Sequence, residues 1–134
     1  MILVDSSAWI DFFNQRDTAA ARILDPLLDQ GERTLAIGDL VLMEVLQGFR
    51  SDRDFKAAKR LLLLLESTAL AVNGWLSAPP ITTGCCAKKG VTVVSSVDVL
   101  IATFCVEQGF DLLHNDNDFI AIQRHLPLKT LQSV

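Results

Sequence analysis

Short apolar runs alternate along this chain with longer segments whose apolar residues recur every three or four positions. The short runs predict buried strands, at residues 1–4, 34–37, 68–72, 111–114 and 128–131. The longer segments predict helices, at residues 8–13, 18–28, 40–49, 52–65, 97–106 and 118–125. Because strands alternate with helices, the pattern predicts an α/β fold with a mostly parallel central sheet. Residues 73–89 fit neither pattern clearly, since Pro79-Pro80 ends any helix that precedes it.

Small polar residues precede most of the predicted helices and are expected to cap them, because their side chains accept hydrogen bonds from free backbone N–H groups. The candidate caps, in chain order, are Asp5, Ser6 or Ser7, Asp39, Asp52 or Asp54, Ser95 or Ser96, and Asp118. Ser6 and Ser7 can cap the first helix without desolvating a charge, so capping alone does not account for Asp5. Gly109 is expected to end the helix at 97–106.

Length and composition predict one domain over residues 1–134. A chain of 134 residues, 50% of them apolar, can form a single core. The longest apolar run, at 61–65, is far too short to span a membrane, so we expect a soluble, cytoplasmic protein with no membrane partner. Its three cysteines lack metal-binding spacing and are expected to be reduced thiols, which agrees with a cytosolic protein.

Four acidic residues stand in apolar sequence, each near a predicted strand end or helix start. They are Asp5, Glu44, Asp98 and Asp116. A carboxylate in such surroundings is costly to desolvate unless it is paired, hydrogen-bonded or bound to a metal. Since function collects at the carboxyl edge of a parallel sheet, residues from distant parts of the chain can meet there. Without obvious basic partners beside them, the four acids are expected to share one cation site.

Oxygen ligands without His or Cys favour Mg²⁺ or Mn²⁺ over zinc. Such an ion can activate a water as nucleophile and stabilise charge on phosphoryl oxygens, which is the chemistry of phosphodiester hydrolysis. The formal net charge of −4 at first argues against a nucleic-acid partner. Setting the four acids aside leaves 12 acidic residues against 12 basic ones, so net charge neither supports nor excludes RNA as a substrate.

Four segments, in this order, together resemble the motifs of the PIN-domain family. They are VDSSAWIDFF at 4–13, LMEVLQGFR at 42–50, VDVLIATFC at 97–105 and LLHNDNDF at 112–119. The closer likeness is to the VapC-type toxins of prokaryotic toxin–antitoxin pairs. This resemblance implies a three-layer α/β/α sandwich and an endoribonuclease that depends on Mg²⁺ or Mn²⁺. It also implies a cognate antitoxin that blocks the enzyme.

The resemblance carries over residue by residue. The catalytic acids of the family match Asp5, Glu44, Asp98 and Asp116, and the metal ligands that it implies are Asp5, Asp98, Asp116 and Asp118. Ser6 or Ser7 matches a hydroxyl that orients the first acid, and Asn115 matches a small polar or basic position. Residues 79–87 depart from the family, because they lack the aromatic residue and the arginine that relatives often carry before the glycine aligned with Gly90.

Five of the twelve basic residues lie between positions 50 and 60. Three of them, Arg53, Lys56 and Arg60, share one helical face that is either solvated or in contact with phosphates. The candidate RNA contacts are Arg50, Arg53, Lys56 and Arg60. Leu61–Leu65, together with Phe55 and Ala58, form a second face that is too broad for one core contact. A homodimer or an antitoxin would cover this apolar face.

Two alternatives to a nuclease start from the same residues. A non-catalytic module that binds an antitoxin or RNA should have lost at least one of the four acids, and none is missing. A phosphatase with an aspartyl nucleophile usually carries a second Asp two residues after the first, where this chain has Ser7. His114, beside the predicted site, is expected to be structural rather than a general base.

Overall fold

A four-stranded parallel sheet runs through the computed structural model, which describes residues 1–30, 34–68 and 96–131. Its strands are β1 (Ile2–Val4), β2 (Leu35–Gly38), β3 (Glu66–Thr68) and β4 (Asp111–Leu113). They lie in the order β3-β2-β1-β4, and each neighbouring pair is parallel. The predicted α/β class with a parallel sheet is therefore confirmed.

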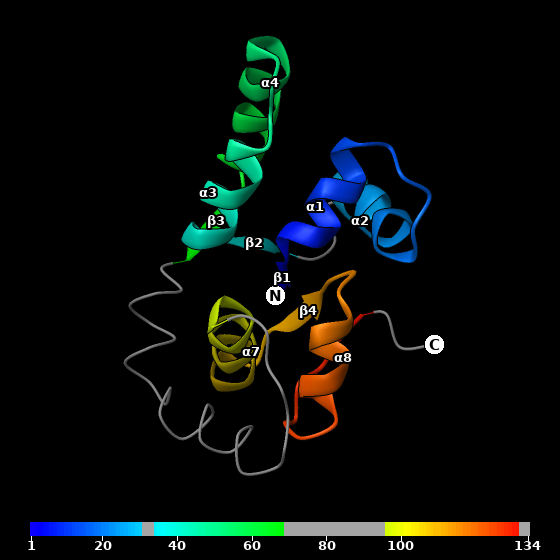
Figure 1. Cartoon of the computed structure of the whole chain (residues 1–134), viewed down its shortest axis with the longest axis vertical. Coiled ribbons are helices and arrows are strands. Elements are labelled where there is room, and N and C mark those ends of the chain that lie inside the picture. Colours follow the sequence, from blue (N-terminus) through cyan, green and yellow to red (C-terminus); the bar gives the residue numbers. More distant parts are fainter. Residues whose placement is uncertain (31–33, 69–95, 132–134) are drawn as a thin grey trace.

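Helices cover both faces of this sheet (Figure 1). One layer holds α1 (Ser6–Phe13), α2 (Ala19–Gln30), α3 (Asp39–Gln47) and α4 (Asp52–Leu62), and the other holds α7 (Ser96–Gln108) and α8 (Asn117–Gln123). Because crossovers between parallel strands are right-handed, connections that run in opposite directions along a sheet place their helices on opposite faces. This gives the predicted three-layer α/β/α sandwich. None of the described helices has both the length and the apolar character needed to cross a bilayer.

The two helical layers explain why the central strands β1 and β2 lack charged residues, whereas β3, which lies at Glu66–Thr68 rather than at the predicted 68–72, is polar and largely exposed. β1 and β2 are buried along their whole length, as expected for strands that are covered on both faces. Trp9 of α1 and Phe119 of α8 are the largest fully buried side chains among the described residues, one in each helical layer. The core therefore lies on both sides of β1 and β4, and it leaves the carboxyl edge of the sheet for polar side chains.

The predicted caps of α4 and α8 are wrong by one to three positions. The Ser51 hydroxyl, rather than Asp52 or Asp54, caps α4 by accepting a hydrogen bond from the Asp54 N–H at 3.4 Å. At α8 the cap is Asp116, whose Oδ1 accepts from the Asp118 N–H at 2.9 Å. In both helices the residue predicted as the cap lies in the first turn, where negative charge also favours a helix. Composition alone therefore does not separate a cap from the positions that follow it.

The bounds of several elements also differ from the prediction. Asp39 begins α3 instead of capping it, α4 ends at Leu62 instead of 65, and residues 128–131 form only an isolated bridge between Thr130 and Leu112. Gly109, with φ +70°, follows α7 at the predicted position, because glycine adopts this left-handed conformation without strain. The predictions for 69–95, including the cap at Ser95, lie outside the described residues.

Candidate metal centre

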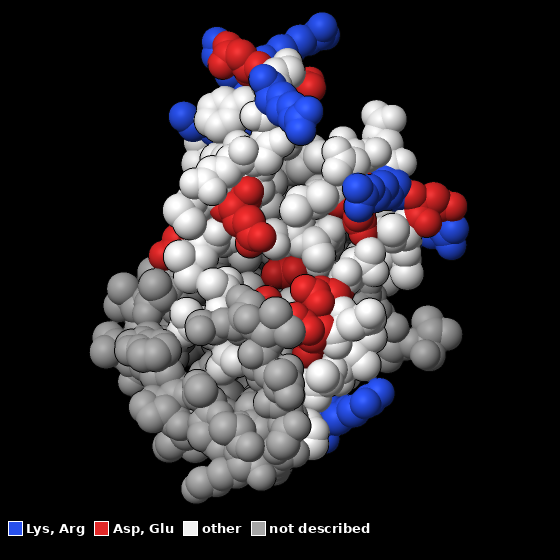
Figure 2. Space-filling model, in the orientation of Figure 1, with Lys and Arg blue, Asp and Glu red and all other residues white. Residues whose placement is uncertain are grey.

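Acidic side chains from both helical layers line one pocket of about 540 Å³ at the carboxyl edge of the sheet. The acids in its lining are Asp5, Glu44, Asp98, Asp116 and Asp118. Figure 2 shows acidic side chains gathered in the middle of this face of the molecule. The structure therefore brings all four predicted catalytic acids, and the further predicted metal ligand Asp118, to the same pocket.

The parallel pairing of β1 with β4 explains why residues from the two ends of the chain meet here. Val4 and Leu113 are partners in the ladder, and each is followed directly by a turn into a helix. The Asp5 N–H continues the ladder by donating to the Leu113 carbonyl at 2.9 Å. β1 and β4 therefore end at the same level of the sheet, so Asp5 and the turn that carries Asp116 both lie at its carboxyl edge.

Asp98, Asp116 and Asp118 form the tightest part of the pocket. Each offers a carboxylate oxygen, and these three oxygens lie within 4.8 Å of one another. All three residues are partly buried. A set of oxygen donors at this spacing suits Mg²⁺ or Mn²⁺, which prefer carboxylate ligands and keep several waters. Asp5 and Glu44 line the same pocket without belonging to this cluster.

The pKa values of two acids in the pocket, Asp98 and Asp5, are raised. Burial, followed by repulsion from Asp5, Asp116 and Asp118, raises the pKa of Asp98 to about 7. Burial likewise raises the pKa of Asp5, against hydrogen bonds from Ser7 that act in the opposite direction. A divalent cation would relieve the same repulsion, so protons and cations compete for this site.

Asp5 is both a helix cap and a member of the pocket, although the sequence presented these roles as alternatives. It is 4% exposed, and its Oδ2 accepts hydrogen bonds from the backbone N–H of Ser7 at 3.1 Å and from the Ser7 hydroxyl at 2.6 Å. Ser7, rather than Ser6, therefore supplies the side-chain hydroxyl that orients Asp5. The backbone N–H of Ser6 also acts to lower the pKa of this carboxyl group.

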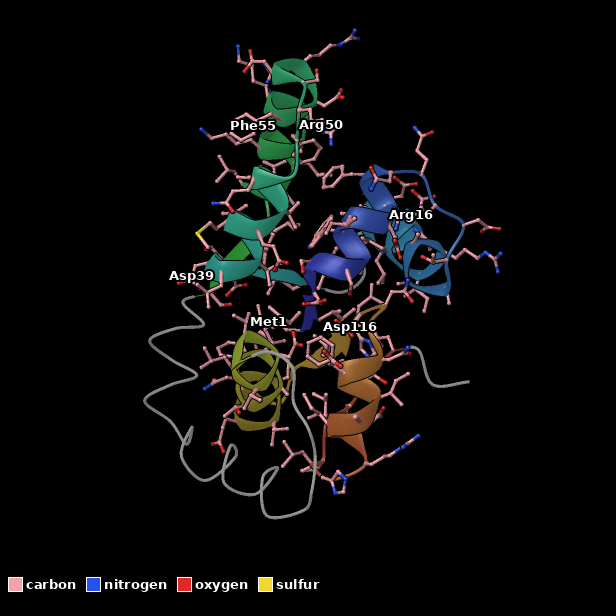
Figure 3. All side chains as sticks on the ribbon, in the orientation of Figure 1. Met1, Arg16, Asp39, Arg50, Phe55 and Asp116 are labelled. Carbon is pink, nitrogen blue, oxygen red and sulfur yellow. The ribbon has the colours of Figure 1, made fainter. Side chains whose placement is uncertain are left out.

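The candidate RNA contacts do not lie in this pocket. Arg50, Arg53, Lys56 and Arg60 are exposed on α4 or just before it. Figure 2 shows basic side chains at one end of the molecule, and Figure 3 places Arg50 well away from Asp116. Lys56 also forms an ion pair with Asp52 at 3.0 Å within α4. Any contact of these residues with RNA would therefore lie far from the acidic pocket.

An apolar wall of the pocket was not predicted from the sequence. Its side chains are Ile10, Leu40, Met43 and Val97, to which Gln47 adds an amide. Ile10 and Met43 are 38% and 53% exposed, so this wall presents apolar side chains at the surface of the pocket. Helical spacing could have identified Ile10, which lies three positions after Ser7, and Leu40, which lies four positions before Glu44. It gives no signal for Met43, because adjacent residues of a helix do not share a face.

His114 has a structural role in the turn after β4. It is 2% exposed, its ring packs against Phe119 with centroids 5.0 Å apart, and its Nδ1 accepts from the Asp116 N–H at 3.2 Å. Burial lowers the pKa of His114 below its usual value. A neutral imidazole held in this way fixes the turn that leads to Asp116, and it is not free to act as a general base.

Comparisons with known proteins agree with this geometry. The family model of the PIN domain matches residues 2–124. A VapC ribonuclease from Mycobacterium bovis and ribonuclease VapC11 from Mycobacterium tuberculosis are each 31% identical over 124 residues, which is 92% of both chains compared. The fold is similar to that of VapBC2 from Rickettsia felis bound to a promoter DNA fragment, with a TM-score of 0.74, 18% identity and 97% of each chain covered. It is also similar to VapC20 from Mycobacterium tuberculosis, described as a toxin that cleaves the sarcin-ricin loop, with a TM-score of 0.65, 17% identity and 90% and 94% covered.

The raised pKa of Asp98 predicts how stability depends on pH when no divalent cation is present. Between the ordinary carboxyl pKa of 3.8 and the value of about 7 in the folded protein, the folded state binds a proton that the unfolded state lacks. The free energy of unfolding should therefore fall as the pH rises through this window. Asp98→Asn should flatten the fall and raise the melting temperature at pH 8, as measured by calorimetry in EDTA.

Asp54→Asn is the matched control, because Asp54 is an exposed acid of α4 outside the pocket. It should retain the pH dependence of the wild type. If Asp98→Asn and the wild type lose stability equally between pH 4 and pH 7, the account of repulsion in the pocket is wrong.

Proposed function

This chain belongs to the PIN-domain family and, within it, to the VapC-type proteins, and from this premise we propose that it is a metal-dependent endoribonuclease, the toxin of a toxin–antitoxin pair. The observation that carries the proposal is the group of three carboxylate oxygens within 4.8 Å, in a pocket that Asp5 and Glu44 also line. The ribonuclease names of two relatives at 31% identity support the same reaction class.

In this proposal, Asp98, Asp116 and Asp118 hold Mg²⁺ or Mn²⁺ through their carboxylates, and Asp5 contributes directly or through water. The bound ion would supply a Lewis acid that offsets charge on the phosphoryl oxygens and lowers the pKa of a water molecule. Ser7 holds the Asp5 carboxylate in one orientation through its 2.6 Å hydrogen bond. Glu44, on α3 and outside the tight cluster, lines the same pocket and would accept a proton there.

Water rather than the ribose 2′-hydroxyl is the proposed nucleophile, so the products would carry 5′-phosphate and 3′-hydroxyl ends. The apolar wall that includes Ile10 and Met43 would contact the sugar or base next to the scissile phosphate, because these groups present apolar surface. Ser7 supports a nuclease over a phosphatase. At the position where such a phosphatase carries its second acid, the Ser7 hydroxyl is engaged with Asp5.

The proposal includes a protein partner that covers the exposed leucines at the end of α4. Leu62 is buried, whereas Leu63 and Leu64 are 62% and 84% exposed at the end of α4. A cognate antitoxin or a second copy of the chain would cover them. The VapBC complexes among the similar structures pair a toxin with its antitoxin. Light scattering with and without Leu64→Lys tests the homodimer, since a mass of one chain in the unsubstituted protein would exclude it.

RNA binding by α4 predicts a specific kinetic signature. Arg53→Gln combined with Arg60→Gln should raise KM for RNA and reduce its dependence on salt, while kcat stays unchanged, because both side chains are exposed and neither lines the acidic pocket. The salt slope should fall by roughly 0.7 for each phosphate of a single strand that the double variant no longer neutralises. Lys129→Gln, an exposed basic residue elsewhere, is the control. An unchanged salt slope in the double variant would remove α4 from the proposed RNA interface.

Cleavage of RNA tests the proposed function itself. Asp5→Asn and Asp98→Asn should each lower the rate by at least about a hundredfold, the scale of removing one group that stabilises charge in the transition state. EDTA should stop the reaction, and Mn²⁺ should restore it. Asp25→Asn, an exposed acid of α2, should cleave like the wild type. Folded Asp5→Asn protein with full activity, or products with 2′,3′-cyclic phosphate ends, would refute the proposal.

A further inference from the structure

A buried acid that the proposed chemistry does not use lies behind the pocket. Asp11 of α1 is 3% exposed and is absent from the pocket lining. Its Oδ2 accepts a hydrogen bond of 2.6 Å from the side-chain amide of Asn115, and its Oδ1 accepts one of 3.4 Å from Arg16. The short bond to Asn115 is the stronger contact, since the Arg16 side chain is 62% exposed. The buried carboxylate of Asp11 therefore interacts chiefly with the side chain of Asn115.

Asn115 is linked in turn to Asp5 through hydrogen bonds that involve Ser7. Its backbone N–H donates to the Ser7 hydroxyl oxygen at 2.9 Å, and the Ser7 hydroxyl donates to Asp5 Oδ2 at 2.6 Å. Because the Ser7 oxygen accepts from Asn115, its single proton is directed at Asp5. A continuous series of hydrogen bonds thus runs from Asp11 through Asn115 and Ser7 to Asp5.

The same series fixes the turn that carries the acids of the second strand. Asn115 directly precedes Asp116, which Figure 3 labels in the turn between β4 and α8. The turn is held by the Asn115 side chain on Asp11, by the Asn115 backbone on Ser7, and by the Asp116 N–H on His114. Asp5 and Asp116 therefore cannot move apart without breaking one of these bonds.

We propose that Asp11 and Asn115 are positioning residues of the metal centre, which hold Asp5 of the β1 end in register with Asp116 and Asp118 of the β4 end. The inference rests on the proposed function, because it concerns the same cation. Mg²⁺ demands close to ideal octahedral geometry, so a small displacement of one carboxylate weakens binding. Removal of a residue that orients a metal ligand typically lowers metal affinity by about tenfold to a hundredfold.

Exchanging the donor and the acceptor tests this inference. Asn115→Asp places a second carboxylate against Asp11, and we expect it to raise the Kd for Mn²⁺ by about tenfold to a hundredfold. Asp11→Asn combined with Asn115→Asp restores one donor and one acceptor with the same total charge, and it should recover most of the affinity. Asn115→Ala, which removes the side-chain bond without adding charge, should weaken Mn²⁺ binding by about tenfold. Isothermal titration calorimetry measures all three.

Three controls separate positioning from other effects. Asn117→Asp adds the same charge on the exposed first residue of α8 and should not weaken Mn²⁺ binding. Arg16→Gln removes the other contact of Asp11 and should bind like the wild type. A merely structural role would lower the folded fraction, and hence the number of sites, but would leave the Kd of the folded molecules unchanged. Melting in EDTA measures that fraction.

The outcomes also distinguish this inference from the proposed function. If Asp98→Asn abolishes Mn²⁺ binding but Asn115→Asp and Asn115→Ala bind as the wild type does, the positioning role is refuted and the metal centre stands. Failure of the double variant to regain affinity, although folded, would also refute it. If the wild type and Asp98→Asn bind Mn²⁺ equally weakly, the metal centre and this inference fail together.

Discussion

Mutual repulsion among the carboxylates at the carboxyl edge of the sheet is the constraint on which this structure depends. Burial, followed by this repulsion, raises the pKa of Asp98 to about 7, and three of the carboxylate oxygens lie within 4.8 Å of one another. A fold that gathers such groups loses stability unless a cation offsets the repulsion. The rest of the molecule supplies the packing that keeps the acids together, with Trp9 and Phe119 filling the two layers on either side of the sheet.

Asp5 and Asp116 each serve both as a helix cap and as an acid of the pocket. Asp5 and Asp116 each cap a helix with one carboxylate oxygen, Oδ2 of Asp5 on Ser7 and Oδ1 of Asp116 on Asp118. The hydrogen bonds from backbone N–H groups stabilise the negative charge, and the second oxygen of each carboxylate is left for another ligand. Because β1 and β4 are neighbours, these two capped helix starts lie side by side. The helix starts therefore anchor the pocket to the sheet.

Hydrophobic pattern predicted the fold well, because strands buried on both faces must be apolar throughout. Asp5 and Asp98 could be singled out from the sequence because a carboxylate is unexpected in such apolar segments. Two features could not be predicted. The hydrogen bond between Asp11 and Asn115 joins residues at opposite ends of the chain and depends on side-chain placement that no local pattern encodes. The helix caps were misplaced because Ser51, Asp52 and Asp54 are all suited to the start of a helix.

Diffraction from crystals soaked in Mn²⁺, with anomalous differences collected near the manganese edge, tests the central claim most directly. The account predicts a strong anomalous peak within coordination distance of the carboxylates of Asp98, Asp116 and Asp118, and no such peak in crystals of Asp98→Asn. A pocket without a peak at millimolar Mn²⁺, or a peak bound only by residues outside it, would contradict the claim that these acids share one cation.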